Sequence, residues 1–243
     1  MSSPAIARPF GTAARVRLAT PVARSARRTM WGATAKRLCD VVGAALLLVI
    51  LAPLFALLAV TVKLADRGGP VFYRQTRVGR WGTPIRITKF RTMHWRYSTG
   101  PERPFQSAEH AFTAMGRPDL CAEYVVARKV IEDPRITRLG RFLRRMSLDE
   151  LPQLVAVLRG ELSLVGPRPI LFGELPMYGA RIGTFLAVRP GITGLWQVSG
   201  RSDVSWDEHV NLDVRYAENW SLLLDLSILV RTLPAVLSRT GAY

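Results

Sequence analysis

The chain has 243 residues, of which 34 are Lys or Arg and 18 are Asp or Glu, so its formal net charge at pH 7 is +16. This length allows one full domain with additions, and the positive charge points to a polyanionic partner: anionic lipid, nucleic acid or a phosphorylated substrate. Two distant cysteines and three scattered histidines match no metal-ligand spacing. They argue against a zinc site or a disulfide framework and favour reduced thiols in a cytoplasm-facing protein.

The amino-terminal segment, residues 1–35, is predicted to be a basic, disordered tail. The first 39 residues contain eight Lys or Arg residues and no Asp or Glu. This composition is also typical of a transit peptide. The apolar segment that follows favours instead a tail on an anionic membrane surface, where each basic residue contributes roughly 1 kcal/mol.

Residues 36–67 are predicted to form a membrane helix. Residues 41–62 are an uncharged, mostly apolar run, and about 20 such residues are enough to span a bilayer. Pro53 lies near the middle, where it removes a helix hydrogen bond, and the flanking residues 21–40 and 63–82 hold five basic residues each. Because basic flanks stay in the cytoplasm, a bent, re-entrant helix satisfies both features. A single span kinked at Pro53 is the alternative that these residues leave open.

Residues 68–243 are predicted to form one domain that begins with a β-hairpin. Its strands, residues 70–78 and 83–90, are rich in β-formers and are joined by Gly-Arg-Trp-Gly. Residues 95–130 show no clear period, and we expect a loop with one short helix. Residues 133–145 are predicted to be helical. Near the carboxyl end, an apolar stretch interrupted by three residues fits either a core helix or a helix in a membrane interface: Asp225, Arg231 and Pro234.

The octapeptide SLDELPQL, which begins at Ser147, carries two adjacent carboxylates, Asp149 and Glu150. Ser followed by Glu three residues later fits a capping box, so one interpretation is that both carboxylates only stabilise a helix N-terminus. In that helix, four residues at helical spacing are predicted to form a buried face: Leu148, Leu151, Val155 and Leu158.

A second interpretation of this carboxylate pair is chemical. Arg141, Arg144 and Arg145 come just before it, and Arg168 follows between two prolines in Gly-Pro-Arg-Pro. Guanidinium groups bind phosphate oxygens bidentately, and a carboxylate can serve as metal ligand, base or nucleophile. The pattern therefore indicates a site for phosphate esters.

The order and spacing of several short motifs add a resemblance to a known family. Over residues 36–243 the motifs are PVFYRQ from Pro70, KFRTM from Lys89, DPRIT from Asp133, SLDELPQL from Ser147, GPRP from Gly166, RPGITG from Arg189, residues 213–216 and the final Gly-Ala-Tyr. In these motifs the chain resembles the bacterial sugar transferases, monotopic polyprenyl-phosphate phosphoglycosyl transferases of the kind that begins exopolysaccharide or glycan assembly.

This resemblance implies an architecture and a location. We expect an α+β, mainly helical monotopic membrane protein, with a re-entrant N-terminal membrane helix broken at Pro53 and a β-hairpin. Residues 68–243 are then an interfacial catalytic domain on the cytoplasmic face of the bacterial inner membrane.

The resemblance also implies a reaction in which Asp149 attacks the β-phosphorus of a UDP-sugar and releases UMP. Undecaprenyl phosphate then takes the sugar phosphate from the covalent intermediate. Glu150 is the expected ligand for Mg²⁺, the cofactor of such enzymes. Beside arginines at a helix N-terminus, we expect Asp149 to stay ionised. Further residues are assigned to substrate or phosphate binding, the last without a specific role: Arg144, Arg145, Arg168, Arg189, Arg201 and Asp213.

The expected partners are a UDP-sugar, undecaprenyl phosphate and anionic membrane lipid. The chain has no helix-turn-helix signature and no aromatic stacking platform, so we expect no nucleic acid. The alternative function is a non-catalytic, membrane-tethered adaptor that binds anionic partners. No motif distinguishes glucose, galactose and an N-acetylated hexosamine as the sugar, and none predicts an oligomeric state.

Overall fold

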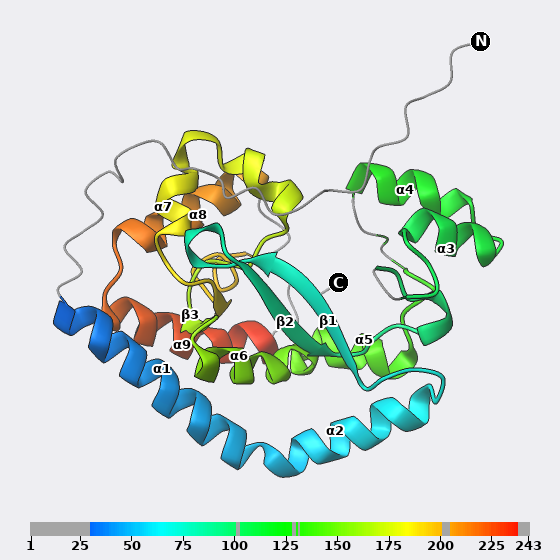
Figure 1. Cartoon of the computed structure of the whole chain (residues 1–243), viewed down its shortest axis with the longest axis horizontal. Helices are drawn as coiled ribbons and strands as arrows, with labels where there is room; N and C mark the ends of the chain where they lie inside the picture. Colours follow the sequence, from blue (N-terminus) through cyan, green and yellow to red (C-terminus); the bar gives the residue numbers. More distant parts are fainter. Residues whose placement is uncertain (1–29, 101–102, 128–129, 131, 201–204, 238–243) are drawn as a thin grey trace.

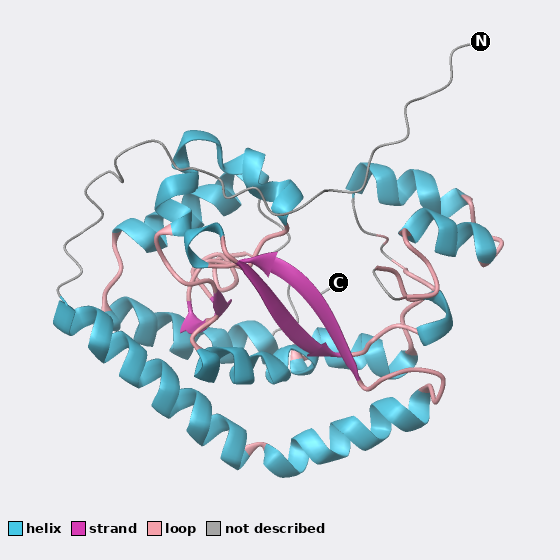
Figure 2. Ribbon diagram, viewed as in Figure 1, coloured by secondary structure: helices cyan, strands magenta, loops and turns pink. Residues whose placement is uncertain are grey.

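The computed structural model describes residues 30–100, 103–127, 130, 132–200 and 205–237. A bent helix pair lies along one edge of the molecule, a β-hairpin crosses its middle, and shorter helices surround the hairpin (Figures 1 and 2). The predicted mixture of helix and strand is confirmed. In chain order the helices and strands are α1 (Met30–Ile50), α2 (Ala52–Ala65), β1 (Phe72–Val78), β2 (Pro84–Phe90), α3 (Ala108–Ala114), α4 (Asp119–Ala127), α5 (Arg138–Arg145), the 3₁₀ helix η3 (Leu148–Gln153), α6 (Leu154–Arg159), β3 (Ser163–Val165), the 3₁₀ helix η4 (Phe172–Arg181), α7 (Ile182–Leu186), β4 (Gly191–Thr193), α8 (Trp206–Glu218) and α9 (Leu222–Leu237).

The predicted break at Pro53 is confirmed. Helices α1 and α2 meet at an angle of 63°, because Pro53 lies in the first turn of α2 and has no N–H to donate to the turn before it. No described helix is long and apolar enough to cross a membrane alone, and the bent pair meets that criterion only as a unit. Residues 30–35, which the sequence assigns to the tail, form the first turns of α1.

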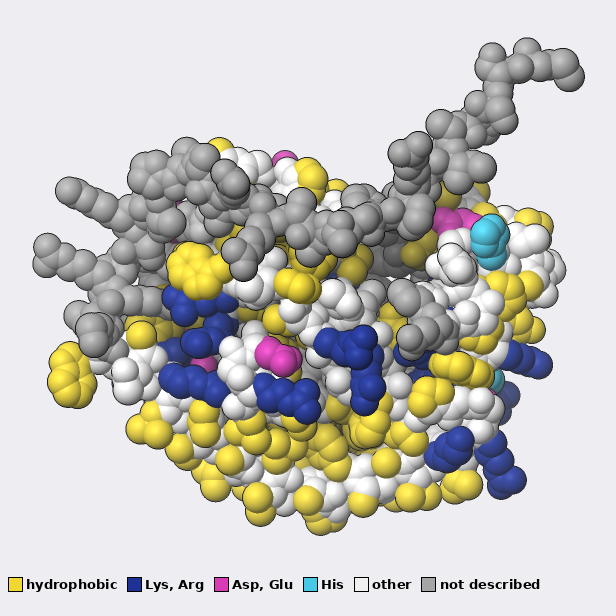
Figure 3. Space-filling model, in the orientation of Figure 1, with side chains coloured by type: hydrophobic (Ala, Val, Ile, Leu, Met, Phe, Trp, Pro, Cys, Tyr) yellow, Lys and Arg dark blue, Asp and Glu magenta, His cyan; other side chains and the backbone are white. Residues whose placement is uncertain are grey.

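The two sides of the bent pair differ in exposure. On the inner side, Ala44 packs into one buried apolar cluster with β2 and α6, while Leu58 and Val62 pack into another with β2 and α5. The outer side forms the apolar lower edge of Figure 3. Six of its side chains are at least 55% exposed: Leu46, Val49, Ile50, Leu57, Val60 and Leu64.

The predicted hairpin is also confirmed. Strands β1 and β2 pair antiparallel from Phe72–Phe90 to Val78–Pro84. A second sheet, which the sequence does not predict, pairs β3 with β4 in parallel. Each of these strands has only three residues, too few to show an alternating pattern.

The described part of the segment 95–130 contains two short α-helices and a single 3₁₀ turn, Trp95–Tyr97, rather than the one short helix expected. Helices α3 and α4 pack against each other around Phe112, which is fully buried. Ser107 caps α3 by accepting a hydrogen bond from the His110 N–H. Both helices span about two turns, so their hydrophobic period is too short to recognise in the sequence.

The capping box predicted at Ser147 is wrong. Ser147 has a φ of 53°, in the left-handed region, and its side chain makes no capping bond. Its N–H donates to the carbonyl of Arg144, so Ser147 ends α5 in the manner of a left-handed C-terminal cap. The chain then turns directly into the 3₁₀ helix that carries Asp149 and Glu150.

The predicted buried face of this segment is only half correct. Leu148 and Leu151 pack against a core cluster, but Val155 and Leu158 are 39% and 36% exposed. The reason is a change of period at Leu154, where three residues per turn in η3 give way to the α-helical spacing of α6.

Helix α9 turns one apolar side outward. Its inner side buries Ile228 and Asp225, so the arrangement agrees with an amphipathic helix rather than with one enclosed in the core. The outward residues recur at helical spacing: Leu223, Leu226, Val230 and Leu233, each at least 58% exposed.

Candidate active site

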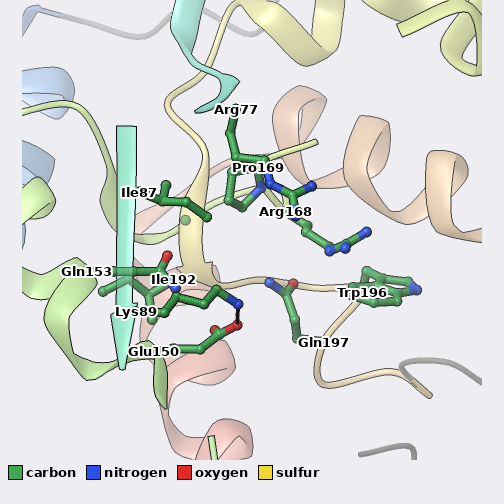
Figure 4. A pocket seen from close by; sticks show the side chains of 11 residues that line it. Arg77, Ile87, Lys89, Glu150, Gln153, Arg168, Pro169, Ile192, Trp196 and Gln197 are labelled. Carbon is green, nitrogen blue, oxygen red and sulfur yellow. Dashed lines mark hydrogen bonds and ion pairs between the residues drawn. The ribbon is translucent and has the colours of Figure 1, made fainter. Parts of the chain in front are cut away.

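The hairpin supplies basic residues from one of its faces. Arg77 pairs with Ile85 and Tyr73 pairs with Lys89, and side chains alternate between the two faces of a strand. Arg77 and Lys89 therefore project from the same face. With Ile87 they line one cavity (Figure 4).

The tight turn after α5 gives the two carboxylates different surroundings. Glu150 lines the cavity, and Lys89 Nζ donates a 2.5 Å hydrogen bond to its Oε1 (Figure 4). Asp149 is only 7% exposed and lies beside the cavity rather than in its lining. One carboxylate thus lines the cavity, and the other is buried beside it.

Burial separates the acidities of the pair. Desolvation, assisted by the charge of Glu150, raises the pKa of Asp149 to about 6 against the opposing charges of Lys89 and Arg144. Burial alone would also raise the pKa of Glu150, but the ion pair with Lys89 and the charge of Arg168 hold it below its ordinary value. Desolvation therefore outweighs the neighbouring cations at Asp149, yet a pKa of about 6 still leaves the carboxylate mostly ionised at neutral pH, as the sequence predicts.

Three glycines fix the loop that carries Arg168. The Gly166 N–H donates to the Thr193 carbonyl at 2.9 Å, and the Gly191 N–H donates to the Pro167 carbonyl at 2.8 Å. A Cβ on Gly166 would lie 2.4 Å from the Arg189 carbonyl oxygen, and one on Gly194 would lie 2.1 Å from the Gly166 carbonyl oxygen. Only glycine permits this approach, so the Gly-Pro-Arg-Pro and Pro-Gly-Ile-Thr-Gly motifs form one structural unit.

The cavity has a volume of about 120 Å³ and combines cationic, amide and aromatic side chains. Arg77 is only partly satisfied there: its Nη2 donates to Gln75 Oε1 at 2.8 Å and its Nη1 lies 3.9 Å from Glu174 Oε2. Its Nε and Nη1 have no hydrogen-bond partner among the described residues, and burial lowers its pKa to about 10. A buried guanidinium with unused donors favours an anionic ligand. The lining residues are Arg77, Ile87, Lys89, Glu150, Gln153, Arg168, Pro169, Gly191, Ile192, Trp196 and Gln197.

The structure brings some of the predicted phosphate-binding residues together. Arg168 lines the cavity. Arg144 is near enough for its charge to act on Asp149, and its Nε donates to Thr92 Oγ1 at 2.9 Å. Arg145, in the last turn of the same helix, is exposed and lies outside the cavity lining.

The other predicted residues are placed elsewhere. Arg189 Nε donates to the Gly160 carbonyl at 2.9 Å, so it stabilises the end of α6 instead of lining the cavity. Arg201 lies outside the described residues. Asp213 is 1% exposed on α8 and accepts a 2.7 Å hydrogen bond from the Tyr178 hydroxyl, so it is behind the cavity wall.

The sequence motifs assign no role to Lys89 and do not identify Arg77. The signal that identifies them is the hairpin register: the loop length fixes which residues pair, and period-two alternation then places both on the same face. Trp196 and Gln197 have no comparable signal, because only the packing of the loop after β4 brings them to the cavity.

A family model described as bacterial sugar transferase matches residues 31–239. The chain belongs to the bacterial sugar transferase family. It is 44% identical over 212 residues to the exopolysaccharide production protein ExoY of Rhizobium meliloti (strain 1021), covering 87% of this chain and 89% of the relative.

Two other relatives of this sugar transferase carry more specific names. A UDP-glucose:undecaprenyl-phosphate glucose-1-phosphate transferase of Caulobacter vibrioides is 43% identical over 216 residues, covering 86% of this chain and 72% of the relative. An undecaprenyl-phosphate galactose phosphotransferase of Salmonella typhimurium is also 43% identical, over 209 residues, but this chain covers only 41% of its length.

Proposed function

We propose that this sugar transferase moves a sugar 1-phosphate from a UDP-sugar to undecaprenyl phosphate, releases UMP and so begins exopolysaccharide or glycan assembly. The observation that carries the proposal is the convergence of Arg77, Lys89 and Arg168 on one small cavity beside Asp149 and Glu150. Three cations suit a diphosphate, and the adjacent carboxylates suit its chemistry. Relatives named for undecaprenyl-phosphate sugar transfer support the same reaction class.

In the first step, an Asp149 carboxylate oxygen forms a bond to the β-phosphorus of the UDP-sugar. The bond from that phosphorus to the bridging oxygen breaks, and UMP leaves with the electron pair. Because the pKa of Asp149 is about 6, the buried carboxylate is still mostly ionised at neutral pH and poorly solvated, which favours nucleophilic attack.

In the second step, a phosphate oxygen of undecaprenyl phosphate attacks the same phosphorus. The acyl-phosphate bond to Asp149 breaks, and the polyprenyl-diphospho-sugar leaves. The positive charges of Arg77, Lys89 and Arg168 offset the charge on the phosphoryl oxygens in both steps. The charges of Lys89 and Arg144 favour the ionised form of the Asp149 carboxylate that is restored.

The residues present are compatible with Mg²⁺. The described residues contain no cluster of three His, Cys, Asp or Glu side chains, but Mg²⁺ is commonly held by one or two carboxylates together with substrate phosphates. Glu150 is the proposed ligand, because it is the carboxylate that lines the cavity. When bound, the ion would neutralise charge on the donor diphosphate.

We further propose that the bent pair α1–α2 is a re-entrant membrane element, with residues 68–243 as an interfacial catalytic domain on the cytoplasmic face of the inner membrane. Two features support the attachment to a membrane. The outer side of the pair is apolar, and Figure 3 has a row of Lys and Arg side chains directly above that edge. Such a pattern suits acyl chains below and anionic headgroups beside the cavity.

The test is UMP release by detergent-solubilised full-length protein from UDP-glucose, UDP-galactose and UDP-N-acetylglucosamine. Each reaction contains Mg²⁺ and undecaprenyl phosphate, with parallel reactions lacking each. The proposal expects sustained release that requires the lipid, prefers one sugar and is lost in Asp149→Asn. Folded protein that releases no UMP from any donor would instead support a membrane-tethered adaptor for anionic partners.

A further inference from the structure

An aromatic wall lies beside the phosphate-binding Arg168. Its guanidinium carbon lies 5.6 Å from the centroid of the Trp196 ring, a separation that allows a cation–π interaction. Both residues line the cavity (Figure 4). The orientation of the indole therefore bears directly on where the guanidinium sits.

His209 holds this indole from behind. The His209 ring stacks on Trp196, with the two centroids 4.1 Å apart and the planes 17° apart. The ring of Trp206 meets the His209 ring edge-on, with a centroid separation of 4.9 Å. His209 is 2% exposed and lies outside the cavity lining. Because His209 covers one face of Trp196 and Arg168 lies over the ring, the indole is poorly placed to stack on a nucleobase.

Asp213 packs beside His209, although His209 Nε2 has no hydrogen-bond partner among the described residues. Asp213 Oδ2 lies 3.2 Å from His209 Nε2, one helical turn away on α8, and also accepts the 2.7 Å hydrogen bond from Tyr178. Burial and the Asp213 charge raise the pKa of Tyr178 above its usual range, so the hydroxyl remains a donor. This buried carboxylate has contacts from two elements, η4 and α8, which restrict its position.

We propose that His209 and Asp213 are positioning residues, which act through Trp196 to hold Arg168 ready for the diphosphate of the donor. The inference rests on the proposed function, because it assumes that Arg168 binds that diphosphate. A guanidinium held in place before binding loses less conformational entropy when the ligand arrives. Asp213, assigned from sequence to the substrate site, acts in this account without touching substrate.

The chain offers a matched control for this network. Tyr178 and Tyr216 are each 1% exposed, and each donates to a buried aspartate: Tyr178 to Asp213 at 2.7 Å and Tyr216 to Asp225 at 2.8 Å. The Tyr216 hydroxyl also donates to the Val165 carbonyl at 2.9 Å. Only the first pair leads to the cavity through side chains, because the second contacts the backbone of β3. Replacing each tyrosine with phenylalanine therefore removes a similar hydrogen bond to a buried aspartate. UDP binding should weaken in Tyr178→Phe and stay unchanged in Tyr216→Phe.

The experiment measures UDP affinity by calorimetry, which needs no turnover, together with KM and kcat for the preferred UDP-sugar. Tyr178→Phe and Asp213→Asn should each weaken UDP binding and raise KM by about tenfold, with a smaller change in kcat. Tyr216→Phe should leave UDP affinity, KM and kcat within about twofold of the wild type. In an Arg168→Gln background, both effects should disappear, because there is no guanidinium left to position.

Undiminished effects in the Arg168→Gln background, or an equal loss of affinity in Tyr216→Phe, would overturn the positioning role. If Asp213→Asn does not fold, Trp196→Phe and Tyr178→Phe carry the same test. Failure of the proposed function looks different: wild-type protein then neither binds UDP nor releases UMP.

Discussion

Two buried clusters of charge in this protein are built in opposite ways. In the first, Lys36 bridges Asp40 at 3.1 Å and Asp225 at 2.8 Å. Asp40 also accepts hydrogen bonds from the Ser163 hydroxyl and the Leu164 N–H. Asp225 accepts hydrogen bonds from the side chains of Tyr216 and Trp220. This cluster connects α1 to β3 and α9.

The second cluster, around the cavity, is incompletely satisfied. Arg77 has buried nitrogens without a hydrogen-bond partner among the described residues, its pKa is lowered by burial, and the pKa of Asp149 is raised by burial. A cluster whose charged groups all have partners, here called the saturated cluster, contributes to stability. Shifted pKa values and unpaired hydrogen-bond donors beside a cavity instead indicate a ligand site. Charge and burial alone do not distinguish a structural cluster from a ligand site. The distinction comes from whether each buried polar atom has a hydrogen-bond partner.

The largest expected effect is on turnover at Asp149. Asp149→Asn should lower the UMP release rate roughly 10³-fold or more, because the amide cannot form the covalent intermediate. Asp119→Asn, at an exposed aspartate paired with Arg117, is the control and should retain the wild-type rate. Comparable turnover in both variants would contradict the assignment.

The same Asp149→Asn variant should be at least as stable as the wild type at pH 7. The pKa of Asp149 is raised from 3.8 to about 6 on folding, so the folded state binds more protons between these values. The free energy of unfolding therefore falls as pH rises through that window. Thermal unfolding at pH 4, 5, 6 and 7 should show this decline in the wild type and a weaker one in Asp149→Asn.

The saturated cluster should show the reverse behaviour. Lys36→Met leaves Asp40 and Asp225 buried without their shared cation, which should cost about 3–5 kcal/mol of unfolding free energy. UDP affinity of the protein that remains folded should not change. Chemical denaturation and calorimetry measure the two quantities; weakened UDP binding with intact stability would erase the distinction between the clusters.

Arg77→Gln should affect binding without this loss of stability. Removing this guanidinium also removes its contacts with Gln75 and Glu174, but it relieves the burial of its unused donors. The substitution is expected to weaken UDP binding about 10- to 100-fold and to change the Tm little. Arg86→Gln, on the opposite face of the hairpin, is the matched control. A large fall in Tm for Arg77→Gln would mean that Arg77 is structural.

The smallest effect is a shift in pH dependence. Below the Asp149 pKa of about 6, UMP release should fall about tenfold per pH unit as the carboxylate becomes protonated. In Glu150→Gln, residual activity should decline only at lower pH, because the neighbouring negative charge that raises the Asp149 pKa is gone. An unchanged acidic limb in that variant would argue against Asp149 as the titrating group.

The sequence predicts those features that depend on local chemistry. Pro53 breaks the apolar helix because its missing N–H acts within one turn, and the hairpin follows from alternating β-formers around a short, glycine-rich loop. Strands β3 and β4 are not predictable in this way. They are three residues long and pair across the segment between them.

The candidate site divides along the same line. Asp149, Glu150 and Arg168 stand out in short motifs, whereas the role of Arg77 follows only from the strand register and that of Trp196 only from tertiary packing. Arg189 is as prominent in the sequence as Arg168, but its side chain reaches the Gly160 carbonyl. No local pattern distinguishes a guanidinium that ends a helix from one that lines a cavity.

The most direct test of the account is to find where the phosphosugar is attached. Full-length protein is incubated with the preferred UDP-sugar without lipid acceptor, and the adduct is located by mass spectrometry in the wild type, Asp149→Asn and Glu150→Gln. The account predicts one phosphosugar on Asp149, absent from Asp149→Asn and discharged by undecaprenyl phosphate. An adduct on Glu150, or UMP release that occurs only with lipid and without any adduct, would contradict it.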